Sequence, residues 1–163
     1  MRVDYINPFT VSAFSVLKDL FKEIKDAEVK QGQISLKSTT KTIMGVAAMV
    51  GLAGDVEGRV LLDMSKETAL DVAGVMNGGE KFTVFDEMAK ATIQELANII
   101  TAQAVTKLHD LGFKFDLTPP ALFTGENMEV STNLGEVEAL IVPIELGPYG
   151  KIEVNIAIRE RVK

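Results

Sequence analysis

Residues 83–112 decide the fold, and they read TVFDEMAKATIQELANIITAQAVTKLHDLG. Apolar residues recur in this stretch at the three- and four-residue spacing of an α-helix. We expect Thr83 to open this helix, with Asp86 completing a Thr-x-x-Asp capping signature, and Gly112 to end it. The apolar side of such a helix packs on a sheet. That side consists of Phe85, Ala89, Ile93, Leu96, Ala97, Ile100, Ala104, Leu108 and Leu111.

The opposite side of the same helix carries a polar pair. Glu95 and Asn98 are three residues apart, so their side chains are neighbours that point the same way. Ala91 and Ala102 lie close to them in helical projection, and Met88 is the methionine nearest this side. Because the alanine side chains are short, another molecule could approach the helix backbone here. We therefore predict a docking face made by these residues.

A glutamate and an asparagine can support only some reactions. The asparagine amide both donates and accepts hydrogen bonds, so it can orient a water molecule. Phosphoryl transfer needs mainly positioning and charge neutralisation, so such a pair suffices if a partner brings the phosphoryl group and its metal. Peptide or ester hydrolysis would need a nucleophile or a metal-bound water. From the spacing alone, an ordinary solvated helix face remains the alternative.

The segments before the long helix alternate between helical and strand-like patterns. Asn7 and Pro8 are typical of an N-cap and a first helical position, which predicts a first helix there. Residues 28–63 follow a strand pattern, in which the glycines from Gly51 to Gly58 indicate a hairpin turn. Ser65 is expected to cap a shorter helix over about 66–76.

The segments after the long helix indicate strands. Pro119 and Pro120 force an extended entry, and the last strand alternates in a way that could form an exposed edge pairing with a second subunit. Laying Asn7 on Asn98 also suggests a weak internal pseudo-repeat. We predict one α+β domain over residues 1–163, with a mostly antiparallel sheet packed against long helices. The expected strands are 121–124, 128–132, 137–145 and 151–158.

Composition excludes several classes of function. The formal net charge of −6, without a basic cluster, argues against nucleic acid and against an anionic membrane surface. With no cysteine and one histidine, the chain has no disulfide, no cysteine nucleophile and no recognisable metal-ligand set, so we expect it to bind no cofactor itself. His109 fits an ordinary exposed polar residue. No signal-like stretch opens the chain, which favours a cytoplasmic protein.

The segment QELANI at residues 94–99, with Pro120 twenty-two residues after Asn98, resembles the signature of the CheC/CheX/FliY chemotaxis phosphatases. The stretches 56–58, 65–70 and 76–79 are similar to the CheX branch of that family. One position departs from the family pattern, because Ala91 stands where an Asp or Ser precedes the glutamate by four residues. Thr92 points about 100° further round the helix, so it is no simple substitute.

The resemblance implies a CheX-like fold and a hydrolase that acts on the aspartyl phosphate of CheY-like receiver proteins. By that analogy Asn98 would orient the attacking water and Glu95 would contact the receiver's conserved lysine. The receiver would supply the phosphoaspartate and Mg²⁺, and Pro120 would have a structural role near the site. The resemblance also implies a homodimer built through the sheet.

Two alternative functions, and a possible second site, remain open from the sequence. The chain could be an adaptor of the same fold that binds receivers or the flagellar switch without catalysis, or a purely structural dimer. Asp4 and Asn7 mimic the spacing of Glu95 and Asn98, and relatives of the CheC type carry two sites. The helix cap explains Asn7 equally well.

Overall fold

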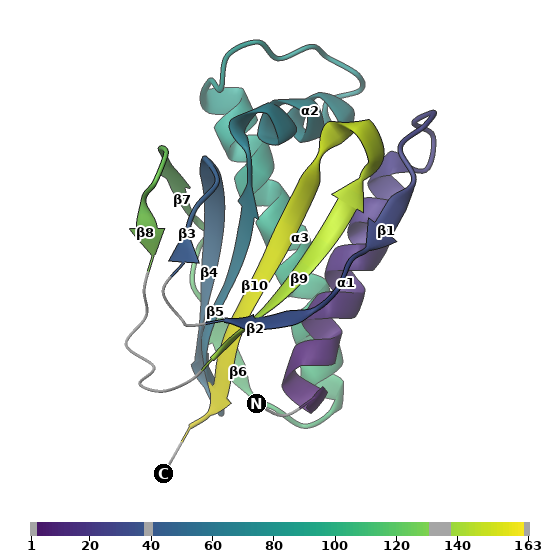
Figure 1. Ribbon diagram of the computed structural model, residues 1–163. Coiled ribbons are helices and arrows are strands. Elements are labelled where there is room, and N and C mark those ends of the chain that lie inside the picture. Colours follow the sequence, from purple (N-terminus) through teal and green to yellow (C-terminus); the bar gives the residue numbers. More distant parts are fainter. Residues whose placement is uncertain (1–2, 38–40, 131–137, 162–163) are drawn as a thin grey trace.

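The chain forms an antiparallel sheet with helices on one face (Figure 1). The computed structural model describes residues 3–37, 41–130 and 138–161. In chain order the elements are α1 (Val3–Phe21), β1 (Val29–Gln31), β2 (Ser35–Lys37), β3 (Lys41–Thr42), β4 (Val46–Gly54), β5 (Val56–Met64), α2 (Lys66–Met76), α3 (Glu87–Asp110), β6 (Phe115–Leu117), β7 (Ala121–Thr124), β8 (Glu129–Val130), β9 (Ala139–Leu146), the 3-10 turn η1 (Gly147–Tyr149) and β10 (Lys151–Glu160).

The main sheet has the order β1-β9-β10-β5-β4-β6, with β2 also paired to β9 and β7 to β4, and every pairing is antiparallel. The α+β prediction is confirmed. The expectation that the last strand is an edge is wrong, because β10 lies between β9 and β5. Both of its faces are covered: Ile156 on the helix side and Asn155 on the other side are each 0% exposed. A strand buried on both faces belongs at the centre of a sheet.

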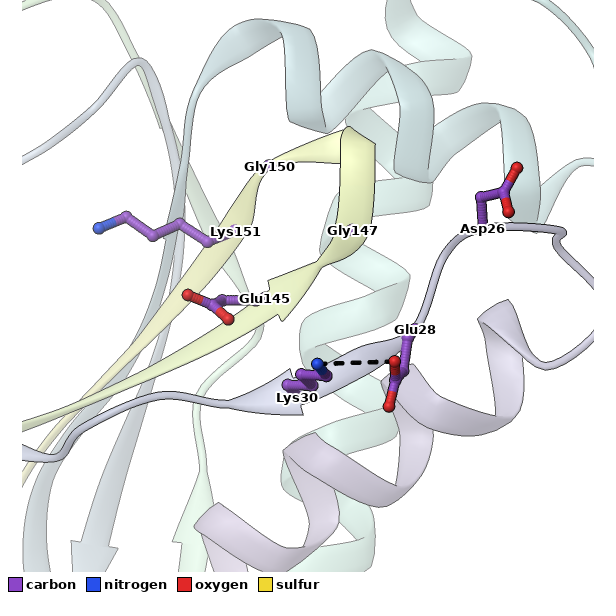
Figure 2. Close-up of a pocket in the computed structure, with 7 residues that line it drawn as sticks. All are labelled: Asp26, Glu28, Lys30, Glu145, Gly147, Gly150 and Lys151. Carbon is purple, nitrogen blue, oxygen red and sulfur yellow. Dashed lines mark ion pairs between the residues drawn. The ribbon is translucent and has the colours of Figure 1, made fainter.

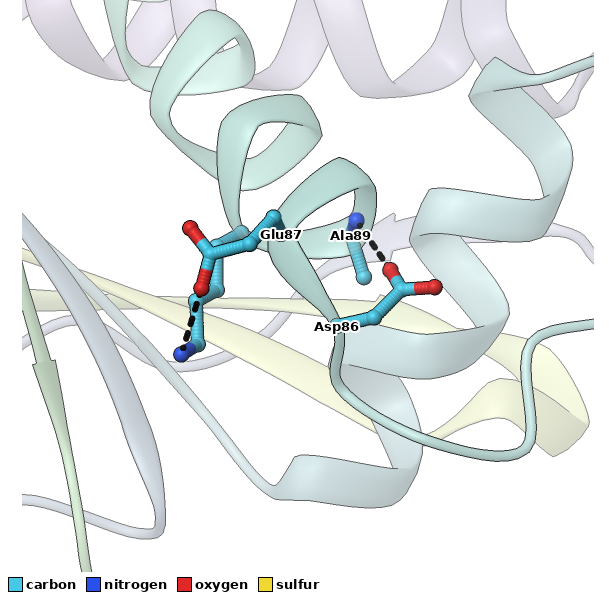
Figure 3. Close-up of polar contacts among 4 residues, drawn as sticks. Asp86, Glu87 and Ala89 are labelled. Carbon is cyan, nitrogen blue, oxygen red and sulfur yellow. Dashed lines mark hydrogen bonds and ion pairs between the residues drawn. The ribbon is translucent and has the colours of Figure 1, made fainter.

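The long helix α3 buries its apolar side as predicted, except at Leu111, which is 61% exposed. Leu111 follows the last helical residue as the C-cap, so it has left the buried stripe. The predicted start at Thr83 is wrong. Asp86 is the N-cap itself, and its carboxylate accepts a hydrogen bond from the Ala89 N–H at 2.9 Å (Figure 3). The stop is confirmed, because Gly112 follows with a φ of 95°.

The first helix also begins earlier than its sequence signals predict. Helix α1 starts at Val3, so Asn7 is not its N-cap and Pro8 lies inside the helix. Tyr5 and Phe9 are four residues apart and only 1% and 0% exposed. Burying the aromatic side chain of Tyr5 releases enough apolar surface from water to outweigh the hydrogen bond that the proline removes. The shorter helix α2 is confirmed over Lys66–Met76, where the Ser65 hydroxyl accepts from Thr68 N–H.

Polar residues are buried on the sheet face away from the helices. Arg59 of β5 is 2% exposed, and its Nη1 donates to Oδ1 of Asn155 on β10 at 2.6 Å. Burial lowers the pKa of the Arg59 guanidinium to about 10. A charge-assisted bond of this kind offsets part of the cost of removing a guanidinium from water.

The remaining sequence predictions concern smaller elements. The hairpin at residues 51–58 is confirmed by the turn between β4 and β5. The predicted strand 128–132 coincides with β8 at Glu129–Val130, but its last two positions, like Val137, lie outside the described residues. The internal pseudo-repeat stays a prediction. No helix in the described part of the chain is long and apolar enough to cross a membrane.

Candidate functional site

Glu95 and Asn98 lie on the solvent side of α3, and both are exposed. The two residues between them, Leu96 and Ala97, are 0% and 1% exposed and form part of the core. Across the described ranges, neither polar side chain is engaged in a hydrogen bond or ion pair. Their carboxylate and amide groups are therefore available to a molecule that approaches this side of the helix.

The helix under this pair is held firmly in place. It packs against α1, α2 and the strands β4 and β7. Thr101, one turn after Asn98, is 1% exposed, and its hydroxyl donates to the Ala97 carbonyl at 2.7 Å. Because the hydroxyl has a hydrogen-bond partner within the helix, Thr101 can be buried among apolar residues. Sequence analysis missed Thr101 as a core residue, because its polar side chain interrupts the apolar pattern.

The predicted docking residues all lie on the exposed side of α3. Met88 is 54% exposed, and Ala91 and Ala102 are exposed as well. Met88 precedes Glu95 by seven residues, about two helical turns, so the two side chains point in nearly the same direction. This side of α3, from Met88 through Glu95 and Asn98 to Ala102, is called the α3 face below. It combines an apolar residue, two small residues and the polar pair.

On one side of the α3 face, a hydrogen bond joins α3 to the segment between β6 and β7. Gln94 is half-buried, and its Nε2 donates to the carbonyl oxygen of Pro120 at 3.1 Å. Gln94 is next to Glu95 in sequence and one turn before Asn98. Pro120 is also half-buried. The structure therefore bonds Pro120 to α3 one turn before Asn98, through a glutamine that sequence analysis did not single out.

On the other side of the α3 face, a hydrogen bond joins α3 to the end of α2. Asn77, the C-cap of α2, donates through Nδ2 to the Thr92 hydroxyl at 3.0 Å, and that hydroxyl donates to the Met88 carbonyl at 2.8 Å. Thr92 therefore joins the two helices. Its hydroxyl is already used, which agrees with the geometric argument that Thr92 does not replace the side chain missing at Ala91.

Other charged regions do not join this site. A hollow beside β1 and the turn before β10 is lined by residues of both signs, and the pair Lys30–Glu28 crosses part of it at 3.6 Å (Figure 2). Over the residues that the structure describes, no group of three or more His, Asp or Glu side chains could hold a metal ion. Glu95 and Asn98 do not line this hollow.

The pair Asp4 and Asn7 lies elsewhere, on the exposed side of α1. Both residues line a shallow hollow with Lys107 and Leu111, near the end of α3. Glu95 and Asn98 do not line it. His109 is exposed and contacts the ring of Phe115, with 5.4 Å between ring centroids. Asp4 and Asn7 therefore lie outside the α3 face, whereas His109 lies on the same side of α3 as Ala102, seven residues or about two turns further along.

Comparison with known proteins identifies the class to which this fold and site belong. The family model for the chemotaxis phosphatase CheX matches residues 46–145, which include α2, α3, Pro120 and most of β9. The matched region is more than half of the chain, and it contains the whole α3 face. The chain therefore belongs to the chemotaxis phosphatase CheX family.

Individual relatives agree with this assignment. The chain is 29% identical over 132 residues to the CheY-P phosphatase CheX of Thermotoga maritima, covering 81% of this chain and 83% of the relative. It is 47% identical to the chain matched in the crystal structure of the CheX–CheY–BeF3–Mg²⁺ complex from Borrelia burgdorferi, with a TM-score of 0.80 and coverage of 98% and 100%. A CheC-like superfamily protein from Shewanella sp. PV-4 is 28% identical, with a TM-score of 0.84 and coverage of 98% and 99%.

Proposed function

We propose that this protein hydrolyses the aspartyl phosphate of a CheY-like response regulator, using Glu95 and Asn98 on the α3 face. The observation that carries the proposal is the exposure of both groups, side by side, on a helix whose other side is buried. Two relatives support the choice of substrate. The Thermotoga maritima relative is a CheY-P phosphatase, and the Borrelia burgdorferi complex contains CheX together with CheY and Mg²⁺.

The chemistry assigned to this chain is modest. Water attacks the phosphorus atom, the bond from phosphorus to the aspartate oxygen breaks, and the products are inorganic phosphate and a free carboxylate. Asn98 can hold the attacking water because its amide both donates and accepts. Glu95 can pair with the receiver's lysine and so fix the receiver's position. The receiver brings Mg²⁺, which neutralises charge on the phosphoryl oxygens.

The test measures loss of phosphate from a phosphorylated receiver with and without this protein. We expect the native chain to accelerate the loss, and Asn98→Ala to reduce that acceleration by about 10²-fold or more, as for loss of one positioned catalytic contact. Gln103→Ala is the matched control, since Gln103 is exposed on the same helix but outside the α3 face. Equal acceleration by the Asn98→Ala variant would refute the proposed site.

The same experiment separates an enzyme from an adaptor. An adaptor of this fold would bind the receiver without accelerating phosphate loss, and the Glu95→Ala change would then affect binding alone. The similarity to a CheY-P phosphatase from Thermotoga maritima favours the enzyme.

We also propose that two copies associate through the sheet and that the protein works in the cytoplasm, where its phosphorylated receiver would be found. The apolar residue Leu36 on β2 is 57% exposed, on a strand that pairs only with β9 in the described part of the sheet. Light scattering should give twice the chain mass for the native protein, and Leu36→Glu should lower it. Cell fractionation tests the location.

A further inference from the structure

The segment between β6 and β7 contains a β-bulge. Both strands pair with β4, but their registers differ by one residue: Leu52 faces Leu117, whereas Met49 faces Ala121. Thr118 N–H still bonds to the Gly51 carbonyl at 2.9 Å. The extra residue is therefore accommodated at Pro119–Pro120, between two points where the segment is bonded to β4.

The two prolines suit this bulge. Proline has no N–H, so neither residue could continue the hydrogen-bond ladder, and such residues are tolerated at bulges and in edge strands. The bulged segment lies at the edge of the sheet, since β6 and β7 pair only with β4 among the described strands. Only the carbonyl groups of the prolines can bond, and the Pro120 carbonyl accepts from Gln94 on α3.

This bond fixes the bulge beside the proposed catalytic pair. Gln94 and Asn98 are four residues apart on α3, so their Cβ atoms are about 5–6 Å apart. The bulge is thus bonded to β4 at both ends and to α3 at its middle. Pro120 remains partly exposed, next to the side of α3 that carries Asn98.

We propose that Gln94 is a positioning residue that holds the Pro119–Pro120 bulge as one wall of the receiver-docking surface. The inference rests on the proposed function and assigns Gln94 to docking, not to chemistry. Without the bond, the bulge would keep its two attachments to β4 but could move away from α3. Glu95 and Asn98 would stay in place, because α3 is held by its buried side.

The experiment measures stimulated phosphate release at increasing concentrations of phosphorylated receiver. Gln94→Met keeps the length of the side chain and removes the donor; Gln103→Met makes the same change at an exposed position outside the α3 face. We expect Gln94→Met to raise the half-saturating receiver concentration by about 3- to 10-fold, as for loss of one net hydrogen bond. The maximal rate should stay within about twofold of native. Gln103→Met should change neither, and Gln94→Lys, which restores a donor, should recover part of the loss.

Three outcomes would overturn the inference. The half-saturating concentration could be native in Gln94→Met, or Gln103→Met could raise it equally. The maximal rate could fall with no change in half-saturation, which would place Gln94 in the chemistry. If Asn98→Ala were inactive while Gln94→Met behaved as native, only this inference would fail. If the native chain did not accelerate phosphate release at all, the proposed function would fail first.

Discussion

Replacing Asp86 by alanine tests how α3 is held at its start. The Asp86 carboxylate caps the helix by accepting the N–H of Ala89, which belongs to a fully buried residue. Loss of such a cap costs about 0.5–2 kcal/mol, and loss of its charge near the helix N-terminus about 0.3–1 kcal/mol more. Glu87 stays in the first turn and retains part of the charge effect, although its pair with Lys90 at 3.3 Å is too exposed to add much. We expect a total loss of about 1–2 kcal/mol.

Urea unfolding followed by far-ultraviolet circular dichroism measures this loss. The midpoint should fall while the slope of free energy against urea stays unchanged, and the melting temperature should drop by roughly 2–8 °C for a chain of this size. Asp86→Asn is the control, because asparagine caps helices about as well as aspartate. A free energy of unfolding for Asp86→Ala within 0.3 kcal/mol of native (roughly the resolution of such comparisons), or an equal loss in Asp86→Asn, would refute the reasoning.

Three other predictions concern the strand β5, the buried Arg59 and the metal that the reaction needs. Gly58→Ala should lower the free energy of unfolding by more than about 2 kcal/mol in thermal melts, because φ is 145° there and a Cβ would collide with the Ala157 carbonyl. Gly78→Ala, with open space around it, should cost less than Gly58→Ala; the reverse order would contradict this explanation. Asn155→Ala should cost about 1.5–3 kcal/mol in urea unfolding, since the buried Arg59 loses a charge-assisted bond of 2.6 Å, and a cost below 0.5 kcal/mol (within ordinary surface variation) would argue against it. Calorimetry should detect no Mg²⁺ binding to this chain alone, whereas chelating Mg²⁺ in the complete reaction should stop stimulated phosphate release; continued release would remove the receiver's metal from the mechanism.

Sequence signals correctly predicted the helices in which the capping residues and the buried residues indicate the same boundaries. Ser65 begins α2 where the capping pattern placed it, and the apolar stripe of α3 is buried as its spacing required. The signals failed where tertiary burial competed with them. Asn7 and Pro8 predicted a helix start, but the burial of Tyr5 extends α1 toward the N-terminus. The central position of β10 depends on contacts with β5, about a hundred residues earlier in the chain, which no local pattern encodes.

The candidate site likewise has residues that the sequence predicts and one contact that it does not. The spacing of Glu95 and Asn98 was sufficient to predict that they share one side of a helix, because both lie within one turn. The contact of Gln94 with Pro120 could not be recognised from sequence, since it depends on a register shift between β6 and β7. The signal that could have pointed to it was the pair of prolines, which cannot continue a strand and so indicate a bulge.

The shape of the site also fits a protein substrate that holds the phosphoryl group and the metal in its own site. Glu95 and Asn98 line none of the hollows beside β1, at the end of α3 or at its start. An enzyme for a small molecule usually encloses its substrate in a concave pocket. A phosphorylated receiver already holds its phosphoryl group and metal, so the proposed catalytic groups would have to reach toward it from an exposed surface. A rigid helix with small residues such as Ala91 and Ala102 around the polar pair satisfies that requirement, because neither alanine blocks the approach of the receiver to Asn98.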